Sequence, residues 1–202
     1  MSKFSRRMFA QTAFAALGMT AFAAPQAAWA LNDAQAKALV DKTVAEINRV
    51  ISSGQSLGRM ISDFERIFTR YADVNIIARS TLGPDSRRAS AAQMRAFTTA
   101  FRGYVARKYG KRFNEFVGGV ITVQGVRKVK SYHEVVTMVK LKGEAPFDVK
   151  FLVSDKSGKD LFFDMIIEGI SLRLTERTEI GSMLDRRRGD IDGLIEDLKK
   201  AG

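Results

Sequence analysis

Hydrophobic residues recur every three to four positions through the first half of the chain, as they do in helices that bury one face. Residues that can cap a first turn stand before each such stretch. The pattern predicts four helices: residues 33–52 after Asn32, residues 57–71 after Ser56, residues 74–82 after Asp73, and a long helix that begins at Ser90.

From Gly118 the hydrophobic residues alternate with polar ones, which is the pattern of half-buried strands. Strands are predicted at residues 120–129, 132–141, 147–153 and 161–167. In the third, Phe147, Val149, Phe151 and Val153 share one face, and in the fourth Leu161, Phe163, Met165 and Ile167 do. One face of the sheet is therefore expected to be apolar.

After the fourth strand, Gly169 permits a bend, and we expect Leu172 and Leu174 to continue an extended piece. Two last helices follow, the second capped by Asp190. Helices, then antiparallel strands, then helices is the order of an α+β fold.

The first thirty residues have the features of an export signal. Ser5-Arg6-Arg7-Met8-Phe9 carries a twin-arginine pair ahead of an uncharged apolar stretch, and Ala28-Trp29-Ala30 offers a small-x-small cleavage site. The stretch is interrupted by Gln11, Thr12 and Pro25, which disfavours a permanent membrane anchor. We expect cleavage near Ala30, by either the twin-arginine or the general secretory route, and a single domain over residues 31–202.

The net charge indicates which partners to expect, and the cysteine content indicates how the fold is stabilised. Residues 1–30 hold three basic residues and no acid, so residues 31–202 keep a net charge of +8 out of the +11 of the whole chain. Outside the cytosol, lipid headgroups and acidic protein faces are more plausible partners than nucleic acid, although a solvated basic surface explains the charge equally well. No cysteine is present, so the fold depends on its core alone.

The residues that usually carry catalysis are sparse. His133 is the only histidine and has no cysteine or second histidine to complete a metal site, so we interpret it as structural. Asp164 and Glu168 are four apart on a predicted strand, about 13 Å, too far for paired acid–base work. Gly118-Gly119 lacks the rest of a phosphate-binding loop. We therefore predict no catalytic residue, no metal and no cofactor, and not an enzyme.

The apolar faces of the helices and the sheet leave two interpretations open. They can meet and form an ordinary core, or they can stay apart and form a cavity for an apolar ligand. Periodicity alone does not separate the two.

Several short motifs, in order and spacing, resemble the MlaC family of periplasmic phospholipid carriers, also called toluene-tolerance proteins. They are Asp73-Val74, Ala78-Arg79, Leu82-Gly83, Phe97 with Phe101 and Tyr109, the run Asp164-Met165-Ile166-Ile167-Glu168-Gly169-Ile170-Ser171-Leu172, Arg177, and Gly189-Asp190-Ile191-Asp192-Gly193-Leu194-Ile195. The similarity spans residues 33–200. The family often carries tryptophan after the Leu-Gly pair and at the start of the last long strand, where this chain has Asp85-Ser86-Arg87-Arg88 and Asp160.

The resemblance implies a monomeric periplasmic shuttle that exchanges phospholipid between an outer-membrane lipoprotein–porin complex and an inner-membrane ABC transporter with an MCE-domain subunit, and so maintains outer-membrane asymmetry. It implies a twisted antiparallel sheet of four or five strands under helices, with the acyl chains in an apolar cavity between them. The residues expected to bind lipid are Ile76, Ile77, Leu82, Phe97, Phe101, Tyr104, Val139, Leu141, Phe147, Val149, Phe151, Phe163, Met165 and Ile167.

Three alternatives stay open at this point. A hopanoid or other polycyclic lipid could be the cargo of a member of the same family. A periplasmic chaperone-like protein could shield apolar client segments with the same faces. An enzyme acting on a small apolar substrate is the third. Basic groups near predicted helix ends, at Arg87-Arg88, Arg107-Lys108, Lys111-Arg112 and Arg186-Arg187-Arg188, are candidates for transient docking to partners.

Overall fold

The computed structural model describes residues 30–202. In chain order its elements are α1 (Asp33–Ile51), α2 (Leu57–Tyr71), α3 (Val74–Leu82), the 3-10 helix η1 (Gly83–Arg87), α4 (Ala91–Gly110), the 3-10 helix η2 (Lys111–Phe116), β1 (Val120–Val129), β2 (Tyr132–Lys140), β3 (Phe147–Ser154), β4 (Leu161–Ile167), β5 (Ile170–Ser171), α5 (Leu172–Arg186) and α6 (Ile191–Lys200). Residues 1–29 of the predicted signal peptide, with the twin-arginine pair, lie outside the described residues. Among the helices of residues 30–202, none has an apolar run long enough to cross a bilayer.

Side-chain caps explain why α1, α3 and α4 begin where the sequence predicts, whereas the predicted cap of α2, Ser56, makes no side-chain cap hydrogen bond within the described chain. The side chain of Asn32 accepts a hydrogen bond from the backbone of Gln35, whose side chain reaches back to Asn32, and Ser90 and Gln93 repeat this arrangement at α4. Asp73 accepts from the backbone nitrogen of Ile76 at 3.1 Å and starts α3. These contacts satisfy donors that the first turn of a helix leaves free.

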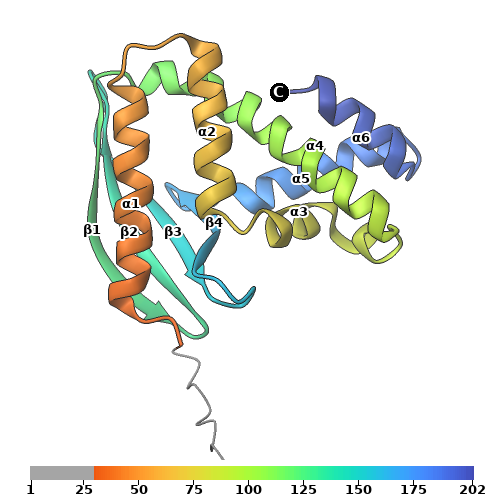
Figure 1. Cartoon of the computed structure of the whole chain (residues 1–202), viewed down its shortest axis with the longest axis horizontal. Helices are drawn as coiled ribbons and strands as arrows, with labels where there is room; N and C mark the ends of the chain where they lie inside the picture. The colour runs from red at the N-terminus through yellow and green to blue at the C-terminus, as the bar shows by residue number, and fades with distance from the viewer. Residues whose placement is uncertain (1–29) are drawn as a thin grey trace, which may run out of the picture.

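The strands form one antiparallel sheet in the order β1-β2-β3-β4-β5, so each strand pairs with the next one along the chain. In Figure 1 the long strands stand upright behind α1, and α3, α4, α5 and α6 extend to the other side of the molecule. This arrangement confirms the predicted α+β fold with helices packed against an antiparallel sheet.

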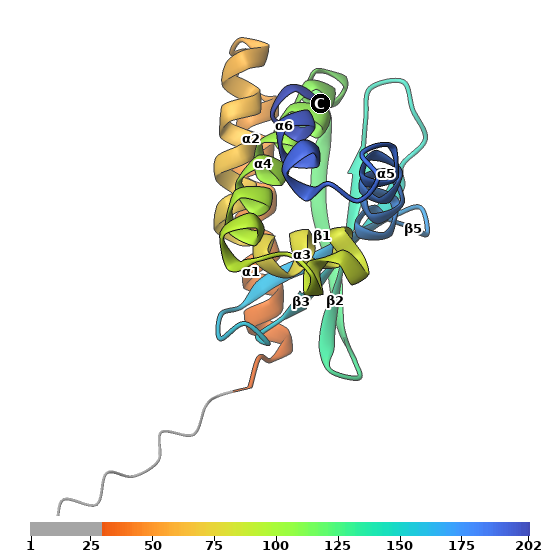
Figure 2. The same cartoon turned by 90° about the vertical axis from the view of Figure 1, so that its right-hand side faces the viewer.

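Each helix has its own neighbours. α1 packs on β1 and β2, α2 packs on α4, α4 packs on α6, and α3 packs on α5. Figure 2 shows α4 between α2 and α6, with α5 on the other side of α6. The helices α3, α4, α5 and α6 therefore form a helical cluster beside the sheet, while α1 covers the sheet.

The extended piece predicted at Leu172 and Leu174 is wrong. Only Ile170 and Ser171 pair with β4, and α5 begins at Leu172. The physical reason is a cap, because the hydroxyl of Ser171 accepts a hydrogen bond from the backbone nitrogen of Leu174 at 3.1 Å. The hydroxyl in turn donates to Asp164 at 2.7 Å, which fixes the first turn of α5 against β4.

The alternation predicted for β4 also breaks near its start. Met165 pairs with Phe151, but a register shift between Leu152 and Val153 places Phe162 opposite Val153. Phe162 thus takes the inner position there and is 4% exposed. The prediction was wrong for Leu161, which pairs with Ser154 on the other face. Phe163 is the extra residue of the bulge, and its ring stands edge-on to that of Tyr132, with centroids 5.6 Å apart.

Candidate functional site

A cavity of about 530 Å³ lies between the inner face of the sheet and the helices. Most of its wall is aliphatic or aromatic. The strands contribute Val139, Phe147, Val149, Phe151, Met165 and Ile167, and the helical side contributes Ile47, Phe64, Phe68, Ile77, Phe101, Val105, Phe113 and Phe116. A space of this size with such a wall is suited to an apolar ligand.

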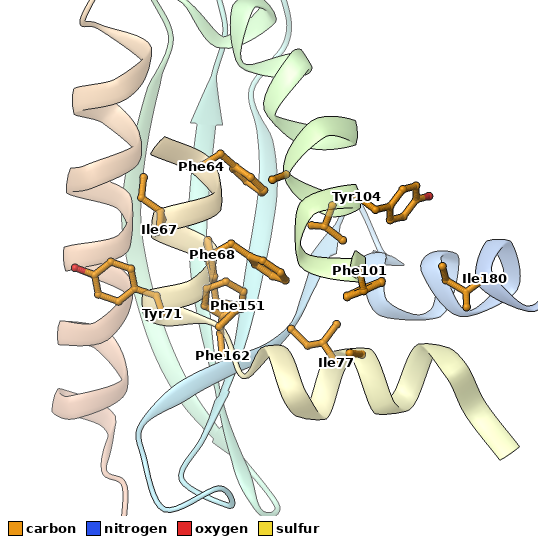
Figure 3. Close-up of a cluster of buried hydrophobic side chains, with 14 of the residues drawn as sticks. Phe64, Ile67, Phe68, Tyr71, Ile77, Phe101, Tyr104, Phe151, Phe162 and Ile180 are labelled. Atoms are coloured by element: carbon orange, nitrogen blue, oxygen red, sulfur yellow. The ribbon is translucent and has the colours of Figure 1, made fainter. Parts of the chain in front are cut away.

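Aromatic rings from α2 and the sheet form one side of the wall. The ring of Phe64 stacks on that of Phe68, with centroids 6.1 Å apart, and meets Phe113 edge-on at 5.1 Å. Phe151 and Phe162 meet edge-on at 5.4 Å. Figure 3 shows Phe64 and Phe68 projecting from α2 toward α4, with Phe151 and Phe162 just below Phe68. Each such ring pair stabilises this part of the wall by about 0.5–1.5 kcal/mol beyond the burial of its area.

Charged and exposed residues border the cavity in one region. Arg112 and Glu115 belong to η2, Glu144 belongs to the connection between β2 and β3, and Glu168 belongs to the turn between β4 and β5. All four are exposed. An apolar cavity with an exposed charged border on one side is open to solvent there, and we take this border as its mouth.

A second polar group forms the wall where α4 meets α5. Glu176 is 3% exposed and accepts hydrogen bonds from Lys108, at 2.8 Å, and from the hydroxyl of Tyr109. Lys108 also pairs with Glu179, which accepts a 2.7 Å hydrogen bond from Tyr104. The oxygen Oε1 of Glu176 thus joins α4 to α5, while Oε2 is buried and has no hydrogen-bond partner among the described residues.

The ionisation of this group follows from its burial. Burial, together with hydrogen bonds to the carboxylates of Glu179 and Glu176, raises the pKa of Tyr104 and of Tyr109 above the usual range. Burial opposes ionisation of Glu179, but hydrogen bonds from Lys108 and Tyr104 outweigh it and lower the pKa of Glu179. At neutral pH both tyrosines are therefore protonated donors.

Asp164 is structural in its contacts. It is 4% exposed, and its carboxylate accepts hydrogen bonds from the backbone nitrogen of Arg173 at 3.1 Å and from the hydroxyl of Ser171. The guanidinium of Arg173 donates to Ser80 on α3 at 2.6 Å. Glu168, in contrast, is an exposed turn residue with φ +48°. Asp164 is thus occupied in holding the start of α5, and Arg173 ties α5 to α3.

Ten of the fourteen residues expected to bind lipid line the cavity. They are Ile77, Phe101, Val139, Leu141, Phe147, Val149, Phe151, Phe163, Met165 and Ile167. The other four lie elsewhere: Leu82, Phe97 and Tyr104 are at most 3% exposed inside the helical cluster, and Ile76 is half-buried on α3.

The sequence interpretation missed the contribution of α2 and η2. Phe64 and Phe68 lie one turn apart in the predicted helix over residues 57–71, and Phe113 and Phe116 follow the end of α4. Their signal was present as aromatic residues at helical spacing. Assigning them to the cavity required knowing that α2 and η2 face the sheet, which depends on tertiary packing.

His133 lies away from the cavity wall. It is 4% exposed, with Nδ1 2.7 Å from Oδ1 of Asp33 and Nε2 2.9 Å from the backbone oxygen of Leu31. It therefore ties β2 to the start of α1. In the described part of the chain, no cluster of three or more histidine, cysteine or acidic side chains is placed to hold a metal ion.

Comparison with known proteins gives two findings. A family model described as MlaC protein matches residues 37–200. A solved structure of a phospholipid-binding protein from Ralstonia solanacearum, in complex with a phospholipid, superposes with a TM-score of 0.70 over 82% of this chain and 95% of that chain, at 17% sequence identity. The structural likeness at this identity shows a shared fold.

Proposed function

This chain belongs to the MlaC family, and on that premise we propose that it is a phospholipid carrier whose acyl chains occupy the cavity between the sheet and the helices. The observation that carries the proposal is the cavity itself, about 530 Å³ with a nearly continuous apolar wall and a charged mouth. The phospholipid held by the Ralstonia protein of the same fold supports it.

The energetics of lipid transfer explain why such a wall is needed. Each methylene that leaves an apolar environment for water costs about 0.8 kcal/mol, so a sixteen-carbon chain costs on the order of 12 kcal/mol. Side chains such as Phe64, Phe151 and Val149 offer an apolar environment in which most of that cost is avoided. The headgroup would then lie at the mouth, near Arg112 and Glu144, where it stays hydrated.

We also propose where the protein acts and with which complexes it exchanges phospholipid. An export signal over residues 1–30 would deliver the domain to the periplasm. There it would exchange phospholipid with an outer-membrane lipoprotein–porin complex and with an inner-membrane ABC transporter that carries an MCE-domain subunit. Exchange of this kind maintains the lipid asymmetry of the outer membrane. The family membership points to binding or transport rather than to catalysis.

A basic patch on the helical side offers a docking surface for an acidic partner face. Arg87 and Arg88 on and beside η1, and Arg186 and Arg188 near the turn between α5 and α6, are all exposed. The two segments lie side by side, because a Cβ on Gly189 would stand 3.5 Å from Nη2 of Arg88. By contrast, Arg107 hydrogen-bonds to the backbone oxygen of Ala201 at 2.8 Å and so serves the fold.

Docking through this patch is expected to raise the association rate at low salt, since exposed charges mainly steer encounter. The test is the rate of binding to the MCE-domain partner for Arg186→Glu with Arg188→Glu. Lys42→Glu with Arg49→Glu on α1 is the matched control, because it makes the same charge change elsewhere. A slower, less salt-dependent association in the first variant alone supports docking here. Equal rates in the two variants would place the docking surface elsewhere.

Native mass spectrometry of the protein purified from the periplasm without detergent tests the carrier function. A phospholipid-sized adduct, identified after extraction, is the expected result. A polycyclic lipid would instead make this a hopanoid carrier, and a peptide adduct would support the chaperone-like alternative. Protein that arrives empty and takes up no phospholipid from vesicles would contradict the proposal.

A further inference from the structure

The start of the described chain is fixed to the sheet by contacts that the cavity does not use. The backbone nitrogen of Leu31 donates to Oδ2 of Asp155 at 3.0 Å, and its backbone oxygen lies 2.9 Å from Nε2 of His133. Asp155 stands directly after β3 and His133 lies on β2, more than a hundred positions from Leu31. The leucine side chain is 6% exposed and belongs to the core. Leu31, which follows the predicted signal peptide, is thus held through its backbone nitrogen, its backbone oxygen and its side chain.

Leu31 is also the residue that follows the predicted cleavage site. We propose that Asp155 is a binding site for the α-ammonium group that cleavage after Ala30 creates on Leu31, so that removal of the signal peptide adds an ion pair to the folded domain. Ala30 is exposed, whereas Leu31 is buried. The boundary between surface and core therefore falls at the bond that the peptidase is expected to cut.

Cleavage is the hydrolysis of the peptide bond between Ala30 and Leu31. Hydrolysis places the hydroxyl of a water molecule on the carbonyl carbon of Ala30 and a proton on the nitrogen of Leu31, and the new carboxylic acid then gives its proton to the new amine. An amide that could donate one hydrogen bond becomes an ammonium that can donate three. The amide already donates to a charged acceptor, and the ammonium adds an opposite charge that strengthens the attraction to Asp155.

Of the charged groups around the site, the carboxylates of Asp155 and Asp33 favour a cation, whereas Lys128 opposes one. The hydrogen bond from Leu31, with one from its own backbone, lowers the pKa of Asp155 below its usual range, and the nearby His133 and Lys128 act in the same direction. Asp155 is therefore ionised at neutral pH. Asp33 also faces the site through its contact with His133. Two carboxylates thus lie near the new positive charge.

This site lies at the end of the sheet remote from the cavity mouth. The wall residues of β2 are Thr137 and Val139, toward its end, while His133 is near its beginning. Figure 1 shows α1 beginning at the bottom of the sheet, beside the turns between strands. The site goes beyond the carrier function, and its loss should leave lipid binding intact.

The first test uses the exported protein. Sequencing the amino terminus of the periplasmic form should read Leu-Asn-Asp, and a start at any other residue would overturn the proposal. The second test compares two purified forms, one beginning at Leu31 and one beginning at Ala30. Both have a free α-amino group and differ by one exposed alanine, so the longer form is a matched control.

The form beginning at Leu31 should unfold at a temperature about 1–4 °C higher at pH 7, the range expected for one partly exposed ion pair in a domain of this size. Asp155→Asn, which preserves the shape of the turn, should abolish the difference, and so should acetylation of the Leu31 amine. A difference that persists in Asp155→Asn, or no difference between the two wild-type forms, would overturn the proposal.

The stability difference between the two forms should depend on pH in a defined direction. An unpaired α-amino group has a pKa of about 7.7–8.0, and the ion pair with Asp155 should raise the value in the folded state. The added stability should be fully present below about pH 8 and disappear as the pH rises through the folded value. Because both forms share Asp33, Lys128 and His133, the difference between their melting curves isolates the effect of placing the α-amino group on Leu31.

Discussion

Two rings one turn apart on α4 belong to different parts of the molecule. Phe97 and Phe101 are both 0% exposed, and their rings are stacked with centroids 5.9 Å apart. Phe101 lines the cavity, whereas Phe97 does not and is packed within the helical cluster. Burial from solvent is therefore the same for a residue in a filled core and for one in the wall of a cavity.

The difference comes from what lies opposite. On one side, α4 packs against α3 and α6, and side chains such as Leu194 and Leu198 of α6 are 0% exposed. On the other side, the rings of α2 and η2 and the inner face of the sheet stand around an open space. The helical cluster should thus respond to mutation as a close-packed interior does, and the cavity wall should not.

Shortening the two phenylalanines should give the largest contrast. Phe97→Ala should lower the free energy of unfolding by about 3–5 kcal/mol, because it leaves a new void in a filled core. Phe101→Ala should cost clearly less in lipid-free protein, because part of its ring already faces open space. Denaturant unfolding of delipidated variants measures both. Equal costs would mean that the space beside Phe101 is closed in solution.

The ionic group at the border between the two parts should give the next largest effect. Lys108→Met removes the cation that compensates the buried Glu176 and should cost about 2–4 kcal/mol, since a buried charge is left without its partner. Adding Glu176→Gln to the same chain should recover part of the loss. A double-mutant cycle by chemical unfolding measures the coupling, and additive effects would show that the pair is not coupled.

The smallest predicted effect is a loss of stability at alkaline pH. Tyr104, in the helical cluster, and Tyr109, on the cavity wall, both have a raised pKa because they are buried and bonded to carboxylates. Stability should be intact below about pH 10, the ordinary value, and fall at higher pH, because only the unfolded chain loses these protons.

Phenolate absorbance recorded beside circular dichroism measures this effect. Ionisation of the two tyrosines should coincide with loss of helical signal, and Tyr104→Phe with Tyr109→Phe should remove that part of the absorbance change. Ionisation of either residue before unfolding would contradict its burial.

Most of the fold could be predicted from the sequence because local signals set it. Caps at Asn32, Asp73 and Ser90 and alternation in β1 to β3 gave the element order. The errors arose where a tertiary contact decided the outcome. Ser171 starts a helix because Asp164 anchors it, and a bulge in β4 moves Phe162 to the inner face. Neither contact has a periodic signal.

The site was harder to predict than the fold. Alternation placed Val149, Phe151 and Met165 on one face, and all three line the cavity. Both Phe97 and Phe101 were expected to bind lipid, because helical spacing places them on one face, but only Phe101 lines the cavity. The distance between backbones decides which apolar face is filled, and that distance is set by the packing of α3, α5 and α6 around α4.

The central claim, that the inner face of the sheet meets an open lipid site at one end and a filled core at the other, is tested most directly on β3. Val149 and Val153 lie on the same face of this strand and are 8% and 0% exposed, but only Val149 lines the cavity. The measurement is thermal unfolding together with the lipid-to-protein ratio for Val149→Trp and Val153→Trp, against delipidated wild type as the reference.

Val149→Trp should stay as stable as delipidated wild type and lose its lipid, because the indole occupies the space of an acyl chain. Val153→Trp should overpack the interior and lose about 1–3 kcal/mol or more. If Val149→Trp is destabilised as much as Val153→Trp while its folded fraction keeps full lipid, the inner face is core at both ends and the lipid site lies elsewhere.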